Sequence, residues 1–391
     1  MTDQTRQPKR PPIWLEAGCG DFDAFRRIVS QAADPADTPT ASDIIRNIPV
    51  YEGQAVDAAA AIPEARQALL EEWATVFAHG AGILVIRQGM HSEQVVDRAT
   101  AIFDRIIADE KRAAKGGGDH FAKPGANDRV WNSLEKHCLA DPANFAAYYS
   151  SNGIALAAEA WLGPAYQMTA QVNRVNPGGA AQTPHRDYHL GFMTAAQMAR
   201  FPAHVHAVSP TLTLQGAVAH CDMPVETGPT LLLPFSQQVF DGYLSFSRPE
   251  YQAWFAEHHV QLPLSKGDLV FFNPAVMHGA GTNHTSDIFR MVNLLQVSSA
   301  FGRAMETVDR SRMVRALYPV LKSPAASVTI DNVIAASAEG YPFPTNLDSN
   351  PPVGGLAPRS QADYLRECLA QNSSDADFFA LMDRLAQVNL S

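Results

Sequence analysis

The feature that most limits the fold is a series of short apolar segments between about residue 165 and residue 300. Each has the length of a β-strand, and its apolar residues alternate or run almost continuously: YQMTAQVNRV, PTLTLQGAVAH, PTLLLP, GDLVFF and RMVNLLQVSS. Pro and Gly separate the segments, and no regular helical pattern lies between them. This pattern is typical of a β-sandwich or barrel. We therefore predict a mainly β core with added helices, of the double-stranded β-helix (jelly-roll, cupin-like) type.

Helical patterns flank this core on both sides. Apolar residues four apart, such as Leu69, Trp73 and Phe77, predict an amphipathic helix before the apolar strand GILVIR. Further helices are expected over 92–112, over 142–161 and in three stretches beyond residue 300, and a long glycine-containing loop is expected over 116–129. The predicted organisation is an irregular N-terminal extension (1–60), a jelly-roll domain with flanking helices (61–300) and a C-terminal helical extension packed on the core (301–391).

Charge and composition exclude several partners. The formal net charge is −10, which argues against nucleic acid and against an anionic membrane surface, because both attract clustered Lys and Arg. The four cysteines lack CxxC spacing, and we expect buried reduced thiols. The N-terminus has no apolar signal segment, and no apolar run could span a bilayer. We expect a cytoplasmic protein with a small-molecule substrate. Its oligomeric state is open, with a homodimer as one option, and the C-terminal helices could serve as a lid or as a dimer contact.

The residues that carry chemistry are His185 and Asp187, separated by one residue, and the distant His278. Residues two apart on a strand share a face, and a later strand can bring the third side chain to the same edge. Two imidazoles and one carboxylate are the ligand set of a facial iron(II) site with open positions. The same set can hold catalytic zinc, so a zinc-dependent hydrolase is an alternative, although the sequence lacks an HExxH helix. A non-catalytic jelly-roll binding protein is a third reading.

Arg290 begins the apolar segment RMVNLLQ shortly after His278. Its planar guanidinium matches a carboxylate with two parallel hydrogen bonds. A dicarboxylate cosubstrate that chelates the metal at one end could therefore be held by Arg290 at the other end. The alternative is an arginine at a strand end that faces solvent or pairs with Asp287.

The HRD segment, the distal histidine and the trailing arginine, together with GDLVFFNPAVMHGAG and ETGPTLLLPFSQ, resemble the phytanoyl-CoA dioxygenase family of iron(II)- and 2-oxoglutarate-dependent oxygenases. The resemblance covers roughly residues 64–300. Where that family usually has a PGSH turn, this chain has Pro234, Phe235, Ser236 and Gln237.

The resemblance implies that His185, Asp187 and His278 bind iron(II), that 2-oxoglutarate and O2 are cosubstrates, and that succinate and CO2 are products. It also implies an oxidation such as hydroxylation rather than chlorination, because a related halogenase has Gly or Ala at the position of Asp187.

Weaker expectations concern residues around the metal site. Gln171 and Asn173, on the strand before HRD, could bond to cosubstrate or water, or bond across the sheet. Thr282 could assist Arg290. Lys123, Arg129 and Trp131 lie in or beside the long loop, where the family often makes ligand contacts, although a solvated loop charge or a core aromatic is the plainer reading. Tyr188 and His189 directly follow HRD and could line a substrate pocket. The sequence does not identify the substrate.

Overall fold

The computed structural model describes residues 12–113, 125–323 and 327–388. Its centre is a sheet of eight strands in the order β1-β2-β3-β8-β6-β10-β5-β4, in which every neighbouring pair is antiparallel except β2 and β3. The strands of this sheet are β1 (Asp43–Ile45), β2 (Ile48–Glu52), β3 (Ile83–Arg87), β4 (Asn127–Val130), β5 (Gln167–Val175), β6 (Thr213–Ala219), β8 (Leu269–Phe272) and β10 (Arg290–Ser298). A smaller antiparallel sheet pairs β7 (Leu231–Leu233) with β9 (Met277–Gly279).

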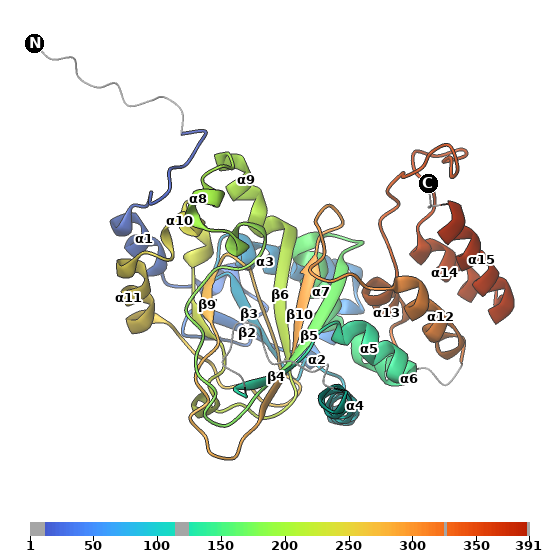
Figure 1. Ribbon diagram of the computed structural model, residues 1–391, viewed down its shortest axis with the longest axis horizontal. Helices are drawn as coiled ribbons and strands as arrows, with labels where there is room; N and C mark the ends of the chain where they lie inside the picture. The colour runs from blue at the N-terminus through green and yellow to red at the C-terminus, as the bar shows by residue number, and fades with distance from the viewer. Residues whose placement is uncertain (1–11, 114–124, 324–326, 389–391) are drawn as a thin grey trace, which may run out of the picture.

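One face of the large sheet is covered by helices (Figure 1). Met291, Leu295 and Val297 of β10 point into this layer and join the largest apolar cluster, which also contains Trp73 and Phe103. The covering helices are α3 (Pro63–Ala78), α4 (Glu93–Arg112), α5 (Ser133–Ala140), α6 (Pro142–Tyr149), α7 (Asn152–Leu162), α12 (Arg310–Leu321) and α13 (Ile330–Ser337). The alternation of β10 therefore sends Arg290, Val292, Leu294 and Gln296 to the opposite face.

Two further groups of helices lie at opposite ends of the molecule (Figure 1). At one end, α14 (Gln361–Ala370) and α15 (Asp375–Val388) pack on α12, where the Tyr318 and Phe378 rings stack 4.1 Å apart. At the other end, α1 (Phe22–Val29) packs on α11 (Pro249–His258) through aromatic contacts of Phe22 and Trp254. The short helices α8 (Ala195–Met198), α9 (Ala203–Val208) and α10 (Gly242–Ser245) lie near this second end. None of the described helices is long and apolar enough to cross a membrane.

The sequence-based expectations for the central segments are confirmed. Each of the five expected strand segments contains a strand, and the helices over α3 and α4 begin and end within two residues of their expected bounds. The large, mainly antiparallel sheet agrees with the predicted β core, and α12 and α13 contribute to the apolar cluster of that core. The three-part division of the chain stays a prediction.

Four local expectations differ from the structure. The expected irregular N-terminal part contains α1, α2 (Gly53–Ala60), β1 and β2, and β2 pairs in parallel with β3 at the sheet edge. The expected helix over 142–161 is two helices, because Ser151 caps α7 by accepting from the Ile154 N–H and donates to the Gly89 carbonyl. The end of the expected loop over 116–129 is β4, paired with β5. Helix α13 was not expected at all.

Candidate metal centre

The uncovered face of the large sheet forms one wall of a cavity of about 540 Å³. Side chains from β5, β6, β8 and β10 line it, and the HRD segment and β9 close it from the other side. The wall near β8 is apolar, with Val270 and Phe272, whereas the wall near β5 and β10 is polar, with Gln171, Asn173 and Gln296. All three predicted metal ligands line this cavity.

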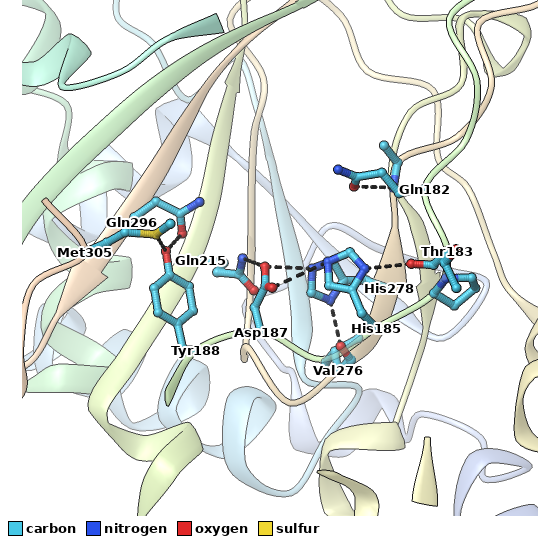
Figure 2. A network of polar contacts seen from close by, with 12 residues as sticks. Gln182, Thr183, His185, Asp187, Tyr188, Gln215, Val276, His278, Gln296 and Met305 are labelled. Atoms are coloured by element: carbon cyan, nitrogen blue, oxygen red, sulfur yellow. Dashed lines mark hydrogen bonds and ion pairs between the residues drawn. The ribbon is translucent and has the colours of Figure 1, made fainter. Parts of the chain in front are cut away.

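His185, Asp187 and His278 converge on one point (Figure 2). One donor atom from each residue lies within 4.8 Å of the others. The Nε2 atom of His185 is 3.5 Å from Oδ1 of Asp187, and Nε2 of His278 is 3.5 Å from Oδ2. These are the only three His, Cys, Asp or Glu side chains in the described ranges that gather closely enough to hold an ion. Two nitrogen donors and one carboxylate on one side of a point fit a divalent metal with open positions on the other side.

Local backbone contacts fix the orientation of both imidazoles. The Nδ1 atom of His185 lies 2.8 Å from the Thr183 carbonyl, and Nδ1 of His278 lies 2.8 Å from the Val276 carbonyl. A carbonyl only accepts, so each Nδ1 carries a proton, and Nε2 is the ring nitrogen that faces the centre of the site. The two residues also exchange backbone hydrogen bonds of 2.8 and 3.0 Å in an isolated antiparallel bridge. The Nε2 atoms are thus the ring nitrogens available to a metal.

Asp187 is held through its carboxylate and through its backbone carbonyl. Gln215 on β6 donates from Nε2 to Oδ2 at 2.6 Å, and Tyr243 donates its hydroxyl to the Asp187 carbonyl at 3.0 Å. Burial tends to raise the pKa of Asp187, but the neighbouring His185 and His278 outweigh it and hold this pKa well below the usual range. The group is therefore an anion at neutral pH, as a metal ligand must be.

Arg186, between the first two ligands, points away from the cavity and is 3% exposed. Its guanidinium donates to the carbonyls of Ser236 and Val239 and lies 5.5 Å from the centre of the Tyr243 ring. Burial lowers the pKa of Arg186 to about 10, so it remains a cation at neutral pH. A Cβ atom on Gly242 would lie 2.0 Å from this guanidinium, so glycine is required there.

Ser236, whose carbonyl accepts from Arg186, also supports the strand that carries the third ligand, His278. The Ser236 hydroxyl accepts from the Met277 N–H at 2.7 Å and donates to the Leu233 carbonyl at 2.6 Å. Arg186 and Ser236 together connect the HRD segment to the strand that carries His278. Sequence reasoning missed Arg186, Gln215 and Tyr243. The sequence shows only that a charged residue, Arg186, stands between two ligands, and this does not tell in which direction its side chain points.

Arg290 lies in the same cavity, as expected. It is 4% exposed, and burial lowers its pKa to about 10. Its recorded side-chain hydrogen bond goes to the Thr227 carbonyl at 3.2 Å, and no ion pair with Asp287 is formed in the described part of the chain. A buried guanidinium with further N–H groups facing a cavity is suited to bind a carboxylate there.

The four remaining residues expected at the cosubstrate differ in outcome. Gln171 and Asn173 both line the cavity, and Asn173 accepts from the Asn127 amide at 2.9 Å across the sheet. Thr282 does not line it, because its hydroxyl accepts from the Ala181 N–H at 3.0 Å and ties two loops together. Lys123 lies outside the described residues.

Three of the four candidate substrate residues face the cavity: Arg129, Trp131 and Tyr188. The Arg129 guanidinium lies 4.8 Å from the centre of the Trp131 ring, and Tyr188 donates its hydroxyl to Gln296 (Figure 2). His189 does not line the cavity. Tyr188 and His189 have φ angles of 65° and 49°, and this left-handed turn takes His189 out of the lining, although Gly191 and Phe192 line the cavity again.

Solved structures to which this chain is similar include the following three. The epimerase SnoN from nogalamycin biosynthesis, described as non-haem and α-ketoglutarate-dependent, is 21% identical over 60% of this chain and 84% of its own, with a TM-score of 0.41. The carbocyclase SnoK from the same biosynthesis is 19% identical over 64% of this chain and 92% of its own, with the same TM-score of 0.41. EctD from S. alaskensis, solved with bound Fe, is 16% identical over 60% of this chain and 78% of its own, with a TM-score of 0.43. A comparison with curated proteins found no match.

A family model gives the stronger result. The model of the phytanoyl-CoA dioxygenase (PhyH) family matches residues 78–292, which is more than half of the chain. The matched region contains both histidines and the carboxylate of the candidate metal centre, and it ends just after Arg290. Sequence match and site geometry therefore agree, and the chain belongs to the phytanoyl-CoA dioxygenase family.

Proposed function

We propose that this protein is a non-haem iron(II)- and 2-oxoglutarate-dependent dioxygenase that hydroxylates or otherwise oxidises a small organic molecule. The observation that carries the proposal is the convergence of two Nε2 atoms and one carboxylate in the cavity that also contains the buried Arg290. In this reading the large sheet and the β7–β9 pair are the two halves of a jelly roll. Iron(II), with 2-oxoglutarate and O2, supplies the oxidising chemistry, and succinate and CO2 are released.

Different residues bind the metal and orient its ligands. His185, Asp187 and His278 bind the metal. The Thr183 and Val276 carbonyls keep a proton on each Nδ1 and leave each Nε2 to bind the metal. Gln215 fixes the direction of the Asp187 carboxylate through Oδ2 and leaves Oδ1 for the metal.

Arg290 binds the distal carboxylate of 2-oxoglutarate in this proposal. The apolar wall of Leu264, Val270 and Val292 excludes water from the carbon chain of the cosubstrate, which strengthens the ion pair with Arg290. Gln171 and Asn173 are placed to bond to cosubstrate, substrate or water. A zinc-dependent hydrolase would leave this buried cation without a role, and so the oxygenase is favoured.

The test uses the purified protein after metal removal. Iron(II) and 2-oxoglutarate added without O2 should produce a visible charge-transfer absorption band, and zinc should not. With O2, succinate should form at least slowly even without substrate. The His185→Ala and His278→Ala variants should lose metal binding, measured by calorimetry, and succinate formation together. Absence of the band in the wild-type protein, with activity restored by zinc alone, contradicts the proposal.

A further inference from the structure

Tyr188, the residue directly after the ligand Asp187, has an unusual backbone conformation. Its φ of 65° and ψ of 143° lie outside the small left-handed region open to residues with a Cβ atom, and close to a region that glycine populates almost alone. His189 follows with a φ of 49°. Such a conformation is unfavourable for tyrosine, and it persists only where contacts elsewhere in the fold outweigh the strain.

The strained backbone brings the Tyr188 ring into the cavity. Alternation along an extended chain would place Tyr188 on the side of Arg186, which does not line the cavity. The residue instead lines the cavity together with His185 and Asp187, and it is 4% exposed. Figure 2 shows its ring beside Asp187, with the two imidazoles on the other side of that carboxylate.

Contacts of the side chain and of the following turn hold this conformation. The Tyr188 hydroxyl donates to the Gln296 amide on β10 and lies 3.2 Å from Sδ of Met305. The Tyr188 carbonyl accepts from the Gly191 N–H at 2.9 Å. A Cβ atom on Gly191 would lie 2.2 Å from the Arg186 carbonyl oxygen, so the turn requires glycine there. The ring therefore connects the HRD segment to β10 in a fixed position.

The position of the ligand Asp187 does not account for the strain. The Asp187 N–H donates to the Pro274 carbonyl at 3.0 Å, and the Asp187 carbonyl accepts from the Tyr243 hydroxyl at 3.0 Å. Gln215 bonds to its carboxylate. These contacts fix Asp187 on both sides of its own Cα atom. The conformation of Tyr188 adds only the placement of its ring in the cavity.

The surroundings of this ring are apolar and rich in aromatic side chains. Phe192, on the same turn, makes an edge contact with the Tyr188 ring at 5.7 Å, and both line the cavity. Trp131 belongs to the same lining, because the residue after it bonds through its N–H to the loop that carries Met305. Contacts between rings, and between sulfur and rings, are favourable beyond the area that they bury. This lining suits a ligand with an apolar ring.

We propose that Tyr188 is a specificity-determining residue, and that the substrate contains an apolar ring system that packs against the Tyr188 ring. This contact places the carbon to be oxidised beside the metal centre. The inference rests on the proposed function, because it takes the metal centre as the place of oxidation. An open-chain molecule lacks the rigid flat surface that matches a ring held at both ends.

The first test measures the strain without metal or ligand. Glycine adopts the Tyr188 backbone conformation freely, whereas alanine does not. Tyr188→Gly should therefore unfold at a higher urea concentration than Tyr188→Ala, the reverse of the usual order. The matched control is Phe192 on the same turn, whose φ is not positive. There the alanine variant should be the more stable of the two. A more stable alanine variant at position 188 removes the argument from strain and overturns the inference.

The second test compares neutral alcohols with equal numbers of carbon atoms: benzyl alcohol, 2-phenylethanol and 3-phenylpropanol with 1-heptanol, 1-octanol and 1-nonanol. Binding to the protein with iron(II) and 2-oxoglutarate is measured without O2, by calorimetry and by the shift of the absorption band. The open-chain alcohols are more hydrophobic, so burial alone favours them. The wild-type protein should still bind at least one ring alcohol about threefold or more tightly than its open-chain partner, as one aromatic contact provides.

Variants assign this preference to one side chain. Tyr188→Leu should remove the preference, and Tyr188→Phe, which keeps the ring, should keep part of it. Phe301→Leu is the control, because Phe301 is 77% exposed and does not line the cavity, and the preference should stay unchanged. Equal or tighter binding of the open-chain alcohols, no binding of any alcohol, or a ring preference that persists in Tyr188→Leu overturns the inference. If the wild-type protein forms no absorption band with iron(II) and 2-oxoglutarate, the proposed function fails instead.

Discussion

The two faces of the eight-stranded sheet differ in the hydrogen bonds that their buried polar side chains make. On the helix-covered face, the polar side chains bond to one another: His220 uses both ring nitrogens, with Thr100 and Tyr148 each at 2.8 Å, and Asn293 donates to Tyr148 at 3.3 Å. On the cavity face, the buried Arg290 side chain has a single recorded hydrogen bond among the described residues, to a backbone carbonyl. A buried cation with so few protein contacts is unfavourable for folding, so Arg290 marks a place where a ligand could bind.

The largest effect is expected from removing the anionic ligand of the cavity face. Asp187→Ala leaves two imidazoles without a carboxylate and frees the Gln215 amide. Iron binding and succinate formation should both be lost completely. Calorimetry with iron(II) and a succinate assay measure the two effects, and circular dichroism checks that the variant is folded. Wild-type iron affinity in a folded Asp187→Ala protein would exclude this residue from the metal site.

The next effect concerns the two buried cations on opposite faces. Arg290→Met should raise the KM for 2-oxoglutarate by about a hundredfold, because truncating one partner of a buried charge pair costs about 2–5 kcal/mol. The matched control is Arg310→Met on the helix-covered side, where Arg310 donates to the Met168 and Ala336 carbonyls at 3.0 and 3.4 Å. Arg310→Met should lower stability and leave this KM unchanged. Equal KM changes in both variants would make the Arg290 effect a general loss of packing.

A smaller effect is expected at Arg186, which contacts no ligand directly. Arg186→Met removes the link between the HRD segment and the Ser236 turn. Supporting residues of this kind typically change metal affinity by about 10- to 100-fold. Iron(II) titration of the variant measures the change, again beside Arg310→Met. If Arg186→Met lowers the unfolding temperature and leaves iron affinity intact, Arg186 stabilises the fold without positioning the ligands.

Lowering the pH should destabilise the protein through two imidazoles on the helix-covered face. Burial lowers the pKa of His137 to about 4 and that of His220 to about 3, so both imidazoles are neutral in the folded protein. In the unfolded chain they bind protons near pH 6.5, so their contribution to stability is complete above that pH and is lost as the pH falls toward 4. The loss is about 1.4 kcal/mol per pH unit for each imidazole. Urea unfolding between pH 7 and 5 measures it, and His220→Gln should reduce the slope.

The smallest effect is expected from a single hydroxyl of that network. Tyr148→Phe removes the hydrogen bond to His220 and an acceptor for Asn293. Stability should fall by about 1 kcal/mol, measured by urea unfolding. Succinate formation and iron affinity should stay at wild-type values, because the network lies on the face away from the cavity. A change in iron affinity would show that the two faces are coupled through the sheet.

The sequence predicted which side chains share a face, because side chains alternate along a strand. His185 and Asp187 share a side because they are two residues apart, and Arg290, Val292 and Leu294 share a face for the same reason. Alternation does not extend to Thr282, because β9 ends at Gly279 and the chain beyond it is a loop. It does not extend to His189 either, because two successive positive φ angles interrupt it.

Contacts between distant segments could not be predicted in this way. Gln215 meets Asp187 only because β6 lies beneath the HRD segment, and Arg186 meets Ser236 only because β9 and the HRD segment lie side by side. Neither partner has a distinctive residue type or spacing. The edge strand β1 and its neighbour β2 were missed because three- and five-residue strands give too short a pattern.

The reciprocal backbone hydrogen bonds between His185 and His278 have a consequence for metal selection. They hold the two rings 4.6 Å apart, and the Nδ1 contacts with backbone carbonyls fix the orientation of each ring. Donor directions that the backbone sets in this way do not depend on one particular metal. Nitrogen and carboxylate donors of fixed geometry also accept cobalt, nickel or zinc, and by the usual order of affinities these bind more tightly than iron(II). The identity of the bound metal is then decided by which ion the cell supplies when the chain folds.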